Sequence, residues 1–261
     1  MGNEYRNIRR SKGNRHKQER PNRMVGWLYR SCRRIRHTVF YPRMGRVLGL
    51  MQITYIQHCG SDLMVVNAAR VSFDKKHDEF DDDKDTRLIR YLARNGHTSP
   101  FNHTFITLHV KAPVFVARQL VKHRFMIWNE VSGRYVVFKP EFYMPDEFRA
   151  KAHDKKQGSG APIVDDEGLR WLFEGAHADA FNNYTCALDL GLCEEQARAL
   201  LPLDLMTQWY WSGTLGAWAS MYNLRAKPDA QAETRMIAEQ AGEIIEPLFP
   251  VSWGALTKGD V

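Results

Sequence analysis

The run from Gln119 to Tyr135 contains the densest group of hydrogen-bonding side chains in the chain, QLVKHRFMIWNEVSGRY. Lys122 and Arg124 flank His123, and Arg134 follows near the end of the run. Cations grouped in this way suit an anionic ligand, because phosphate and carboxylate oxygens accept charge-assisted hydrogen bonds. The amide and hydroxyl groups between them suit the edge of a planar ring. The run therefore predicts a binding site for an anionic ligand that carries a planar ring.

The same residues also fit a simpler interpretation, a solvated basic helix followed by a polar loop. Composition alone supports the two interpretations equally. A sequence motif longer than this group of charged residues is needed to distinguish the two interpretations.

The local pattern around this run predicts the end of a helix followed by a loop. Pro113 suits the first helical turn, because its missing N–H would be unpaired there in any case. Gln119 and His123 are four residues apart, so in a helix they would lie on one face and address one ligand. We expect the helix to end near Trp128 and residues 130–134 to form a loop.

This run resembles a motif of the flavin-dependent thymidylate synthases. Members of that family carry Arg-His-Arg, then seven residues, then Ser-Gly-Arg-Tyr. In this chain Lys122-His123-Arg124 is followed, after seven residues, by Ser132-Gly133-Arg134-Tyr135. The lysine is the one departure, since an ammonium group keeps the charge of arginine but lacks its planar fork.

Four further segments extend the resemblance over residues 51–256. They are Ala-Arg-Val-Ser-Phe at 69–73, His-x-x-Pro-Phe-x-His at 97–103, Arg198 before Ala-Leu-Leu-Pro, and Asn-Leu-Arg at 223–225 followed by Ala-Gln at 230–231. The last three also have a structural interpretation: core or turn histidines, a surface arginine, and for Arg225 a cation at a helix C-terminus, where the dipole favours it. Asn102 stands where family members often have an acidic residue.

The resemblance implies an α+β fold, with a mixed or antiparallel sheet packed with helices. It also implies the reductive methylation of dUMP to dTMP. Methylenetetrahydrofolate would supply the carbon, FAD would carry the reducing equivalents, and NADPH would reduce the FAD. Members of the family are homotetramers whose active sites share residues from several subunits, which the sequence by itself does not show.

The resemblance also implies roles for individual residues. Arg225 is the catalytic residue, because in the family this arginine lies on the uracil ring and favours ionisation at N3. The residues expected to bind dUMP are Gln119, Leu120, Val121, Lys122, Glu130, Val131, Ser132, Gly133, Arg134, Arg198 and Arg225. The residues expected to bind FAD are His97, Ser99, Lys122, His123, Arg124, Glu130, Thr214, Gly216 and Ser220. The last three stand where some members carry other residues, so main-chain contacts are expected there.

The four cysteines predict neither a metal site nor a covalent catalyst. Cys32, Cys59, Cys186 and Cys193 show no paired metal-ligand spacing, and we expect free thiols in a reducing compartment, the cytoplasm. None lies in a cation-rich stretch that would lower its pKa and make it a nucleophile. No Gly-x-Gly-x-x-Gly run occurs, so a Rossmann-type flavin site is not expected.

The charge of the chain is strongly asymmetric. Residues 1–50 hold 14 Lys and Arg against Glu4 and Glu19, a net of +12, whereas the other 211 residues carry 23 Lys and Arg and 28 Asp and Glu, a net of −5. We expect residues 1–50 to form a disordered basic extension and residues 51–261 to form the catalytic domain. A transit peptide, or translation that begins at Met44 or Met51, is an open alternative for the extension.

Two other classes of function compete with the enzyme. The basic extension suggests a nucleic-acid-binding protein, but the acidic balance of residues 51–261 and their lack of a basic stripe disfavour it. A flavin-binding protein without turnover would carry the same motifs. No apolar run is long enough to span a membrane.

Periodicity predicts the remaining elements. Strands are expected at 51–57 and 104–110, and a charge-dense loop at 75–85. Helices are expected at 61–69, 86–94, 167–190, 194–200, 214–225 and 229–248.

Overall fold

The computed structural model describes residues 50–135, 137, 139–152 and 158–259. They belong to one compact unit. The predicted basic extension, apart from Leu50, lies outside the described residues.

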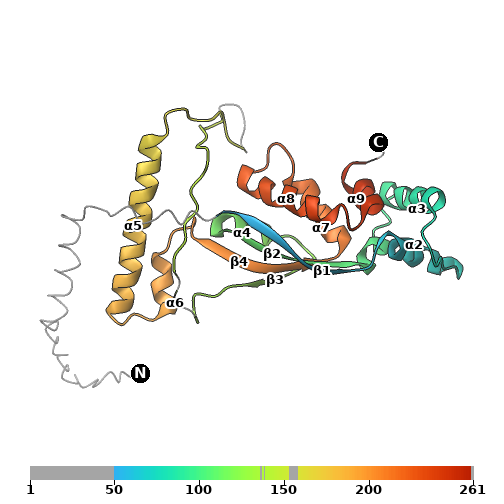
Figure 1. Ribbon diagram of the computed structural model, residues 1–261, viewed down its shortest axis with the longest axis horizontal. Helices are drawn as coiled ribbons and strands as arrows, with labels where there is room; N and C mark the ends of the chain where they lie inside the picture. The colour runs from blue at the N-terminus through green and yellow to red at the C-terminus, as the bar shows by residue number, and fades with distance from the viewer. Residues whose placement is uncertain (1–49, 136, 138, 153–157, 260–261) are drawn as a thin grey trace, which may run out of the picture. The chain divides into compact units, whose positions relative to one another are not determined.

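The described elements mix helices and strands, which confirms the predicted α+β class (Figure 1). In chain order they are β1 (Gln52–Cys59), α2 (Asp62–Arg70), the 3-10 helix η1 (Val71–Phe73), α3 (Asp82–Arg94), η2 (Ser99–His103), β2 (Phe105–Pro113), α4 (Val114–Leu120), β3 (Met126–Glu130), α5 (Glu167–Asp189), α6 (Glu194–Ala197), η3 (Arg198–Leu200), β4 (Met206–Gly213), α7 (Leu215–Arg225), α8 (Ala232–Ile245) and α9 (Pro250–Thr257).

The four described strands form one antiparallel sheet in the order β1-β2-β4-β3. Leu108 of β2 and Trp128 of β3 both lie opposite Trp211 of β4. Side chains alternate between the two faces of a strand, so these three residues share one face of the sheet. Leu108 and Trp211 are buried, and this face carries the core.

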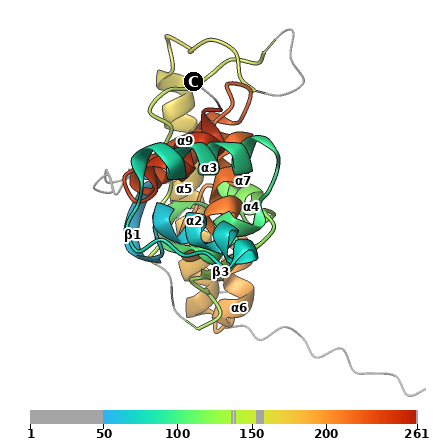
Figure 2. The same ribbon diagram turned by 90° about the vertical axis from the view of Figure 1, so that its right-hand side faces the viewer.

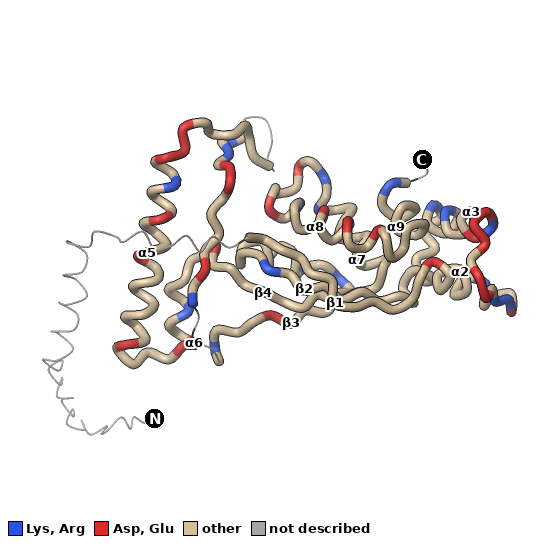
Figure 3. Tube along the Cα trace, viewed as in Figure 1, with Lys and Arg blue, Asp and Glu red and all other residues tan. Residues whose placement is uncertain are grey.

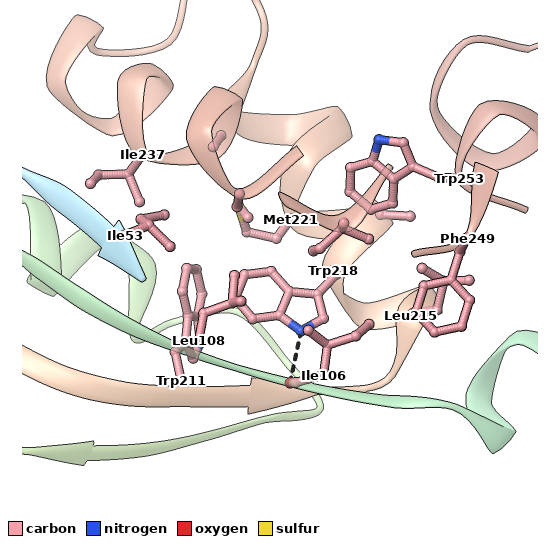
Figure 4. Packing of buried hydrophobic residues seen from close by; sticks show 14 of the residues in the cluster. Ile53, Ile106, Leu108, Trp211, Leu215, Trp218, Met221, Ile237, Phe249 and Trp253 are labelled. Atoms are coloured by element: carbon pink, nitrogen blue, oxygen red, sulfur yellow. Dashed lines mark hydrogen bonds between the residues drawn. The ribbon is translucent and has the colours of Figure 1, made fainter. Parts of the chain in front are cut away.

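Helices α7 and α8 cover the core face of the sheet. The indole Nε1 of Trp218 in α7 donates to the main-chain oxygen of Ile106 in β2 at 3.2 Å (Figure 4). Gln240 of α8 accepts a hydrogen bond from the main-chain N–H of Ile53 in β1 at 3.2 Å. Both contacts tie a helix to the sheet, so the end of α7 has a fixed place above the strands.

Helix α9 connects this core to α2 and α3 (Figure 2). The buried carboxylate of Asp62 accepts from the main-chain N–H groups of Val251 and Ser252 at 3.0 and 2.9 Å. These amides lie in the first turn of α9 and have no partner within the helix, so Asp62 caps α9 from a distance.

Three element boundaries differ from the prediction. Helix α3 begins at Asp82 rather than at residue 86, because Asp81 caps it by accepting from the main-chain N–H of Lys84 at 2.9 Å. The single helix predicted over 229–248 is α8, which begins only at Ala232, and α9 follows as a separate helix. Strand β4 was missed, although its residues alternate between buried and exposed.

The helix predicted from Pro113 to near Trp128 is wrong in its second half. Pro113 ends β2 and lies just before α4, which stops at Leu120. Strand β3 then occupies Met126–Glu130, so Glu130 belongs to a strand and not to the predicted loop. The apolar residues 125–128 that looked like a helix end instead pair with β4.

The described cysteines include both free thiols and a disulfide-bonded residue. Cys59 and Cys193 are free thiols, as predicted. Cys186 is disulfide-bonded, so the prediction of a free thiol there is wrong. Among the described helices, none combines the length and the apolar character that a membrane crossing needs.

Candidate functional site

The ends of α4 and α7 meet at Arg225, the last residue of α7. Its Nε atom donates a hydrogen bond to Nε2 of His123 at 2.9 Å. Its Nη2 atom donates to the main-chain oxygen of Gln119 at 3.3 Å. The structure therefore brings together the predicted catalytic arginine and two of the predicted binding residues, from segments that are more than a hundred positions apart in the chain.

A tight turn between α4 and β3 carries the predicted cations. The main-chain N–H of His123 bonds to the oxygen of Leu120 at 3.1 Å, which closes the helix end. Phe125 then has a φ of 63°, a left-handed conformation that costs a non-glycine residue about 1 kcal/mol. The chain reverses there, and Met126 starts the pairing with β4. Lys122, His123 and Arg124 thus lie on a turn and not on a helix face.

His123 is a neutral acceptor in this site rather than a cation. Burial of the ring, reinforced by the positive charge of Arg225, lowers the pKa of His123 to about 4. Because Nε2 accepts from Arg225, the proton of the neutral ring must be on Nδ1. The imidazole can therefore offer its Nδ1–H to a ligand while its other nitrogen holds the guanidinium.

Lys122 and Arg124 are the cations of this turn that remain available. Both are exposed, and neither forms a hydrogen bond or an ion pair with another described residue. Their charges are not neutralised within the described part of the chain. An anionic ligand would find two unpaired donors beside the His123–Arg225 pair.

Glu130 is held rigidly at the end of β3. Its Oε1 atom accepts from the hydroxyl of Thr207 at 2.7 Å, and its Oε2 atom accepts from Nε1 of Trp128 at 3.1 Å. The next residue, Val131, donates its main-chain N–H to Gln208 of β4 at 3.0 Å. The edge of the sheet therefore fixes the place from which the Ser-Gly-Arg-Tyr segment begins.

Residues 132–135 form a turn, as the sequence predicted for most of this loop. The hydroxyl oxygen of Ser132 accepts from the main-chain N–H and from Nε of Arg134, both at 3.3 Å. The guanidinium of Arg134 lies over the ring of Tyr135, 4.9 Å from its centroid. Gly133 between them is buried. Arg134 itself is exposed, so its charge is accessible from outside the turn.

The segment around η2 lies against the start of α7, which joins two of the predicted flavin segments. Thr214 precedes α7, donates from its hydroxyl to Oδ1 of Asn102 at 2.7 Å, and accepts from the N–H of Ala217 at 3.3 Å. A Cβ atom on Gly216 would stand 2.6 Å from the same Asn102 oxygen, so a larger residue there would displace the exposed Asn102 side chain. Ser220 follows one turn later and is exposed.

Two predicted site residues near η2 have little contact with the rest of the protein. His97 is exposed and stacks on Tyr91, with ring centroids 6.0 Å apart. Ser99 begins η2 and is also exposed. Both side chains are therefore accessible to a ligand that approaches the Asn102–Gly216 contact.

Three predicted dUMP residues contribute differently from the others. Arg198 lies on η3, which packs against α5, and its Nε donates to the main-chain oxygen of Glu195 at 3.2 Å. None of its described hydrogen bonds reaches Arg225 or Gln119. The side chain of Leu120 is completely buried in the core, so only its main chain could meet a ligand. Val121 is half-exposed at the end of α4.

Sequence reasoning missed two polar residues, Asn102 and Gln231. Asn102 belongs to the predicted histidine motif, but only the fold shows that it lies against Gly216. Gln231 accepts a hydrogen bond at its Oε1 atom from Nε2 of Gln119. The Ala-Gln motif after Arg225 was the available signal, but no spacing rule connects residues 119 and 231.

A polar cavity of about 240 Å³ lies beside Gln231. Its wall includes Ala230 and Ala232, the two neighbours of Gln231, together with Arg149 and Arg235. Arg149 is paired with the buried carboxylate of Glu233. The cavity does not include His123 or Arg225, so it adjoins the site described above without being part of it.

The lysines and arginines of the described residues form no continuous basic stripe. Figure 3 shows lysines and arginines scattered among acidic residues over the described helices and strands. No group of three His, Cys, Asp or Glu side chains in the described residues could hold a metal ion. The charge pattern of the described chain thus does not fit an extended nucleic-acid surface.

Comparison with known proteins points to one family. The model of the thymidylate synthase complementing proteins, Thy1, matches residues 54–251. The flavin-dependent thymidylate synthase of Thermus thermophilus is 39% identical over 203 residues, which cover 78% of this chain and 74% of that protein. The enzyme of the same name from Thermosipho africanus is 40% identical over 205 residues, covering 76% and 87%.

A similar solved structure is that of the UMP/dUMP methylase PolB from Streptomyces cacaoi. Its complex with 5-Br dUMP is 32% identical in sequence to this chain, with a TM-score of 0.74. The match covers 80% of this chain and 95% of the PolB chain. The complex with 5-Br UMP gives a TM-score of 0.73.

Proposed function

The chain belongs to the flavin-dependent thymidylate synthase family, and from that premise we propose that it methylates dUMP to dTMP, with methylenetetrahydrofolate as carbon donor, FAD as redox carrier and NADPH as reductant. One observation carries the proposal. Arg225 is held at the meeting point of the α4–β3 turn and the end of α7, beside unpaired Lys122 and Arg124.

Arg225 activates the pyrimidine. Carbon C5 of uracil is a weak nucleophile until negative charge develops on the ring. A guanidinium held by His123 and by the main chain of Gln119 is already oriented, so it stabilises that charge without reorganising. Its Nη1 atom makes no hydrogen bond within the described residues and is free to meet the substrate.

Further polar and cationic groups of the predicted dUMP set orient the nucleotide. Gln119, Lys122 and the Ser132–Arg134 turn offer an amide, an ammonium, a hydroxyl and a guanidinium to the ring and the phosphate. Holding dUMP in one orientation turns an encounter in solution into an oriented reaction. Leu120, Val121, Val131 and Gly133 would contribute main-chain contacts.

Arg198 supports the proposal of a homotetramer with shared active sites. Its side chain is exposed on η3 and makes none of the contacts that gather around Arg225. If Arg198 binds the dUMP phosphate, a site assembled from several copies of the chain is the way to bring it there. This assignment is a proposal that an oligomer-size measurement would test together with the activity.

The residues predicted for FAD fit a flavin nucleotide in two respects. The exposed, unpaired Lys122 and Arg124 suit a pyrophosphate, and glycine at 216 keeps the start of α7 open beside Asn102. His97, Ser99, Thr214 and Ser220 belong to the segments that meet there. His123 contacts Arg225 at the other end of α7, and Glu130 contacts Thr207 near the start of β4, so these two are proposed to meet another part of FAD. When bound, FAD would supply the reducing equivalents for the transferred carbon.

No enzyme side chain needs to bond to the pyrimidine. Cys59 is the last residue of β1, and Cys193 precedes α6. The hydroxyl of Ser132 accepts two hydrogen bonds from Arg134, and no described side chain is placed to take its proton. A thiol or hydroxyl without an activating neighbour is a weak nucleophile.

UMP is a second candidate substrate, because the similar solved structure is named a UMP/dUMP methylase. We favour dUMP, since the more similar relatives are named thymidylate synthases.

The test is the absorbance of the purified protein loaded with FAD. NADPH should bleach the flavin band, and methylenetetrahydrofolate with dUMP should restore it and yield dTMP. Replacing dUMP by UMP is the matched arm, and methylation of UMP at an equal rate would overturn the choice of substrate. A protein that binds FAD but makes no methylated product with either nucleotide would overturn the proposal.

A further inference from the structure

Gln231 uses its side chain on another helix rather than on its own. It lies just before α8, at the N-cap position, yet makes no capping hydrogen bond to the helix. Glutamine is also a poor residue for that position, where Ser, Thr, Asp and Asn are preferred. Instead its Oε1 atom accepts from Nε2 of Gln119 in α4.

We propose that Gln231 is a positioning residue of the pyrimidine site, acting through Gln119; this rests on the function proposed above. Both side chains are partly buried, so the bond between them limits the orientations of the Gln119 amide. The amide of Gln119 can meet a ring edge productively only in some of these orientations. Gln231 selects them before the nucleotide arrives.

Arg225 explains why the orientation of Gln119 matters. The guanidinium donates to the main-chain oxygen of Gln119, so the side chain of this residue starts beside the proposed catalytic group. A ligand bound to Arg225 would therefore lie close to residue 119. An amide already held in place loses less conformational entropy on binding than a free one.

The position of Gln231 makes a clean substitution possible. Its main-chain oxygen accepts from the N–H of Arg235 at 2.9 Å, and no change of side chain removes that bond. Because the side chain does not cap α8, its replacement should leave the helix start intact. Methionine keeps the length without hydrogen bonding, and glutamate keeps an acceptor at the same place.

Gln240 offers a matched control on α8. Its Oε1 atom also accepts a single hydrogen bond, from the main-chain N–H of Ile53 at 3.2 Å. That bond ties α8 to the sheet and involves none of the residues assigned to the pyrimidine. Gln240→Met therefore removes a bond of the same kind that has only a structural role.

The experiment measures the dissociation constants of dUMP and of FAD for each variant, with the melting temperature as a check of folding. Gln231→Met should weaken dUMP binding about fivefold to tenfold, the value of one neutral hydrogen bond, and leave FAD binding unchanged. Gln231→Glu should keep dUMP binding close to that of the unchanged protein. Gln240→Met should lower the melting temperature without changing the dUMP constant.

A double-substitution cycle shows whether Gln231 acts through Gln119. In a Gln119→Met background, Gln231→Met should have no further effect on dUMP binding. Additive losses would overturn the proposal, and so would equal dUMP affinity of Gln231→Met and the unchanged protein. Absence of dUMP binding by the unchanged protein is a different result, because it contradicts the proposed function rather than the role of Gln231.

Discussion

Arg225 donates from Nε to Nε2 of His123 at 2.9 Å, which joins the residue proposed to activate uracil to a residue proposed to contact the flavin. The bond exists only while His123 is neutral, because a protonated ring has no acceptor nitrogen. The low pKa of His123, about 4, keeps the bond intact at neutral pH. The two proposed ligand sites therefore share one structural contact.

The first prediction concerns stability and pH. The pKa of His123 is about 4 in the folded protein and near its usual value of 6.5 in the unfolded chain. Between these values the unfolded chain binds the extra proton, so the free energy of unfolding should fall as the pH drops from about 6.5 to about 4. His123→Gln, which keeps an acceptor but does not titrate, should flatten this part of the profile. Urea unfolding at pH 7 and pH 5 gives the free energy of unfolding of both proteins. An equal change in that free energy between the two pH values for His123→Gln and the unchanged protein would refute the assignment.

The second prediction concerns Arg225. Arg225→Ala should reduce turnover by about a hundredfold to a thousandfold, the scale of losing one donor to a developing negative charge. FAD should still bind, since the proposed flavin contacts remain.

Arg118 is the control for this change. It lies exposed on α4 and makes no described hydrogen bond, so Arg118→Ala should leave turnover unchanged. Turnover of Arg225→Ala within about threefold of the unchanged protein would remove Arg225 from the chemistry.

The third prediction concerns Gly216. Gly216→Ala would place a methyl group 2.6 Å from Oδ1 of Asn102, so the Asn102 side chain must move and give up its hydrogen bond with Thr214. The dissociation constant of FAD should rise. Gly254→Ala in α9 is the control, because its methyl group meets nothing within 4 Å and alanine favours helix over glycine. Equal FAD affinity of the two variants would argue against a flavin site at this opening.

Sequence reasoning proposed residues that the structure brings together, Gln119, His123 and Arg225, but it misjudged the conformation around them. The motif from Lys122 to Tyr135 pointed to these segments, because chemistry constrains residue types and their spacing. It assigned residues 120–128 to a helix, since the apolar run at 125–128 suits a helix face as well as a strand. Pairing with β4 decided the outcome, and no local signal reports a partner strand far along the chain.

Long-range contacts account for the other differences. The neutrality of His123 depends on burial and on Arg225, which is about a hundred residues away in the chain. The Gln119–Gln231 bond depends on the packing of α4 near α8. Helix α3 was predicted to start too late because a cluster of acidic residues is typical of a loop. Acidic residues in the first turn of a helix, however, interact favourably with the helix dipole.

The fourth prediction concerns the basic extension, whose boundary at residue 50 stays a prediction. A chain that begins at Met51 should fold and keep dTMP formation, because β1 begins at Gln52 and Ile53 is its first buried residue. Melting temperature and turnover of the shortened protein measure this. Loss of folded protein or of turnover would make the extension an integral part of the enzyme, and the expected cytoplasmic location is tested separately by imaging the full chain.

The central claim is that this chain makes dTMP through Arg225 and a bound flavin, without a covalent bond between an enzyme side chain and the pyrimidine. The direct measurement is chromatographic detection of dTMP from dUMP by protein in which all four cysteines are replaced by serine or alanine, alongside Ser132→Ala. Folding and FAD binding of each variant are checked first. The account predicts dTMP formation by the cysteine-free protein at a rate of the same order as the unchanged protein, and residual activity in Ser132→Ala. A cysteine-free protein that folds and binds FAD but forms no dTMP would contradict it.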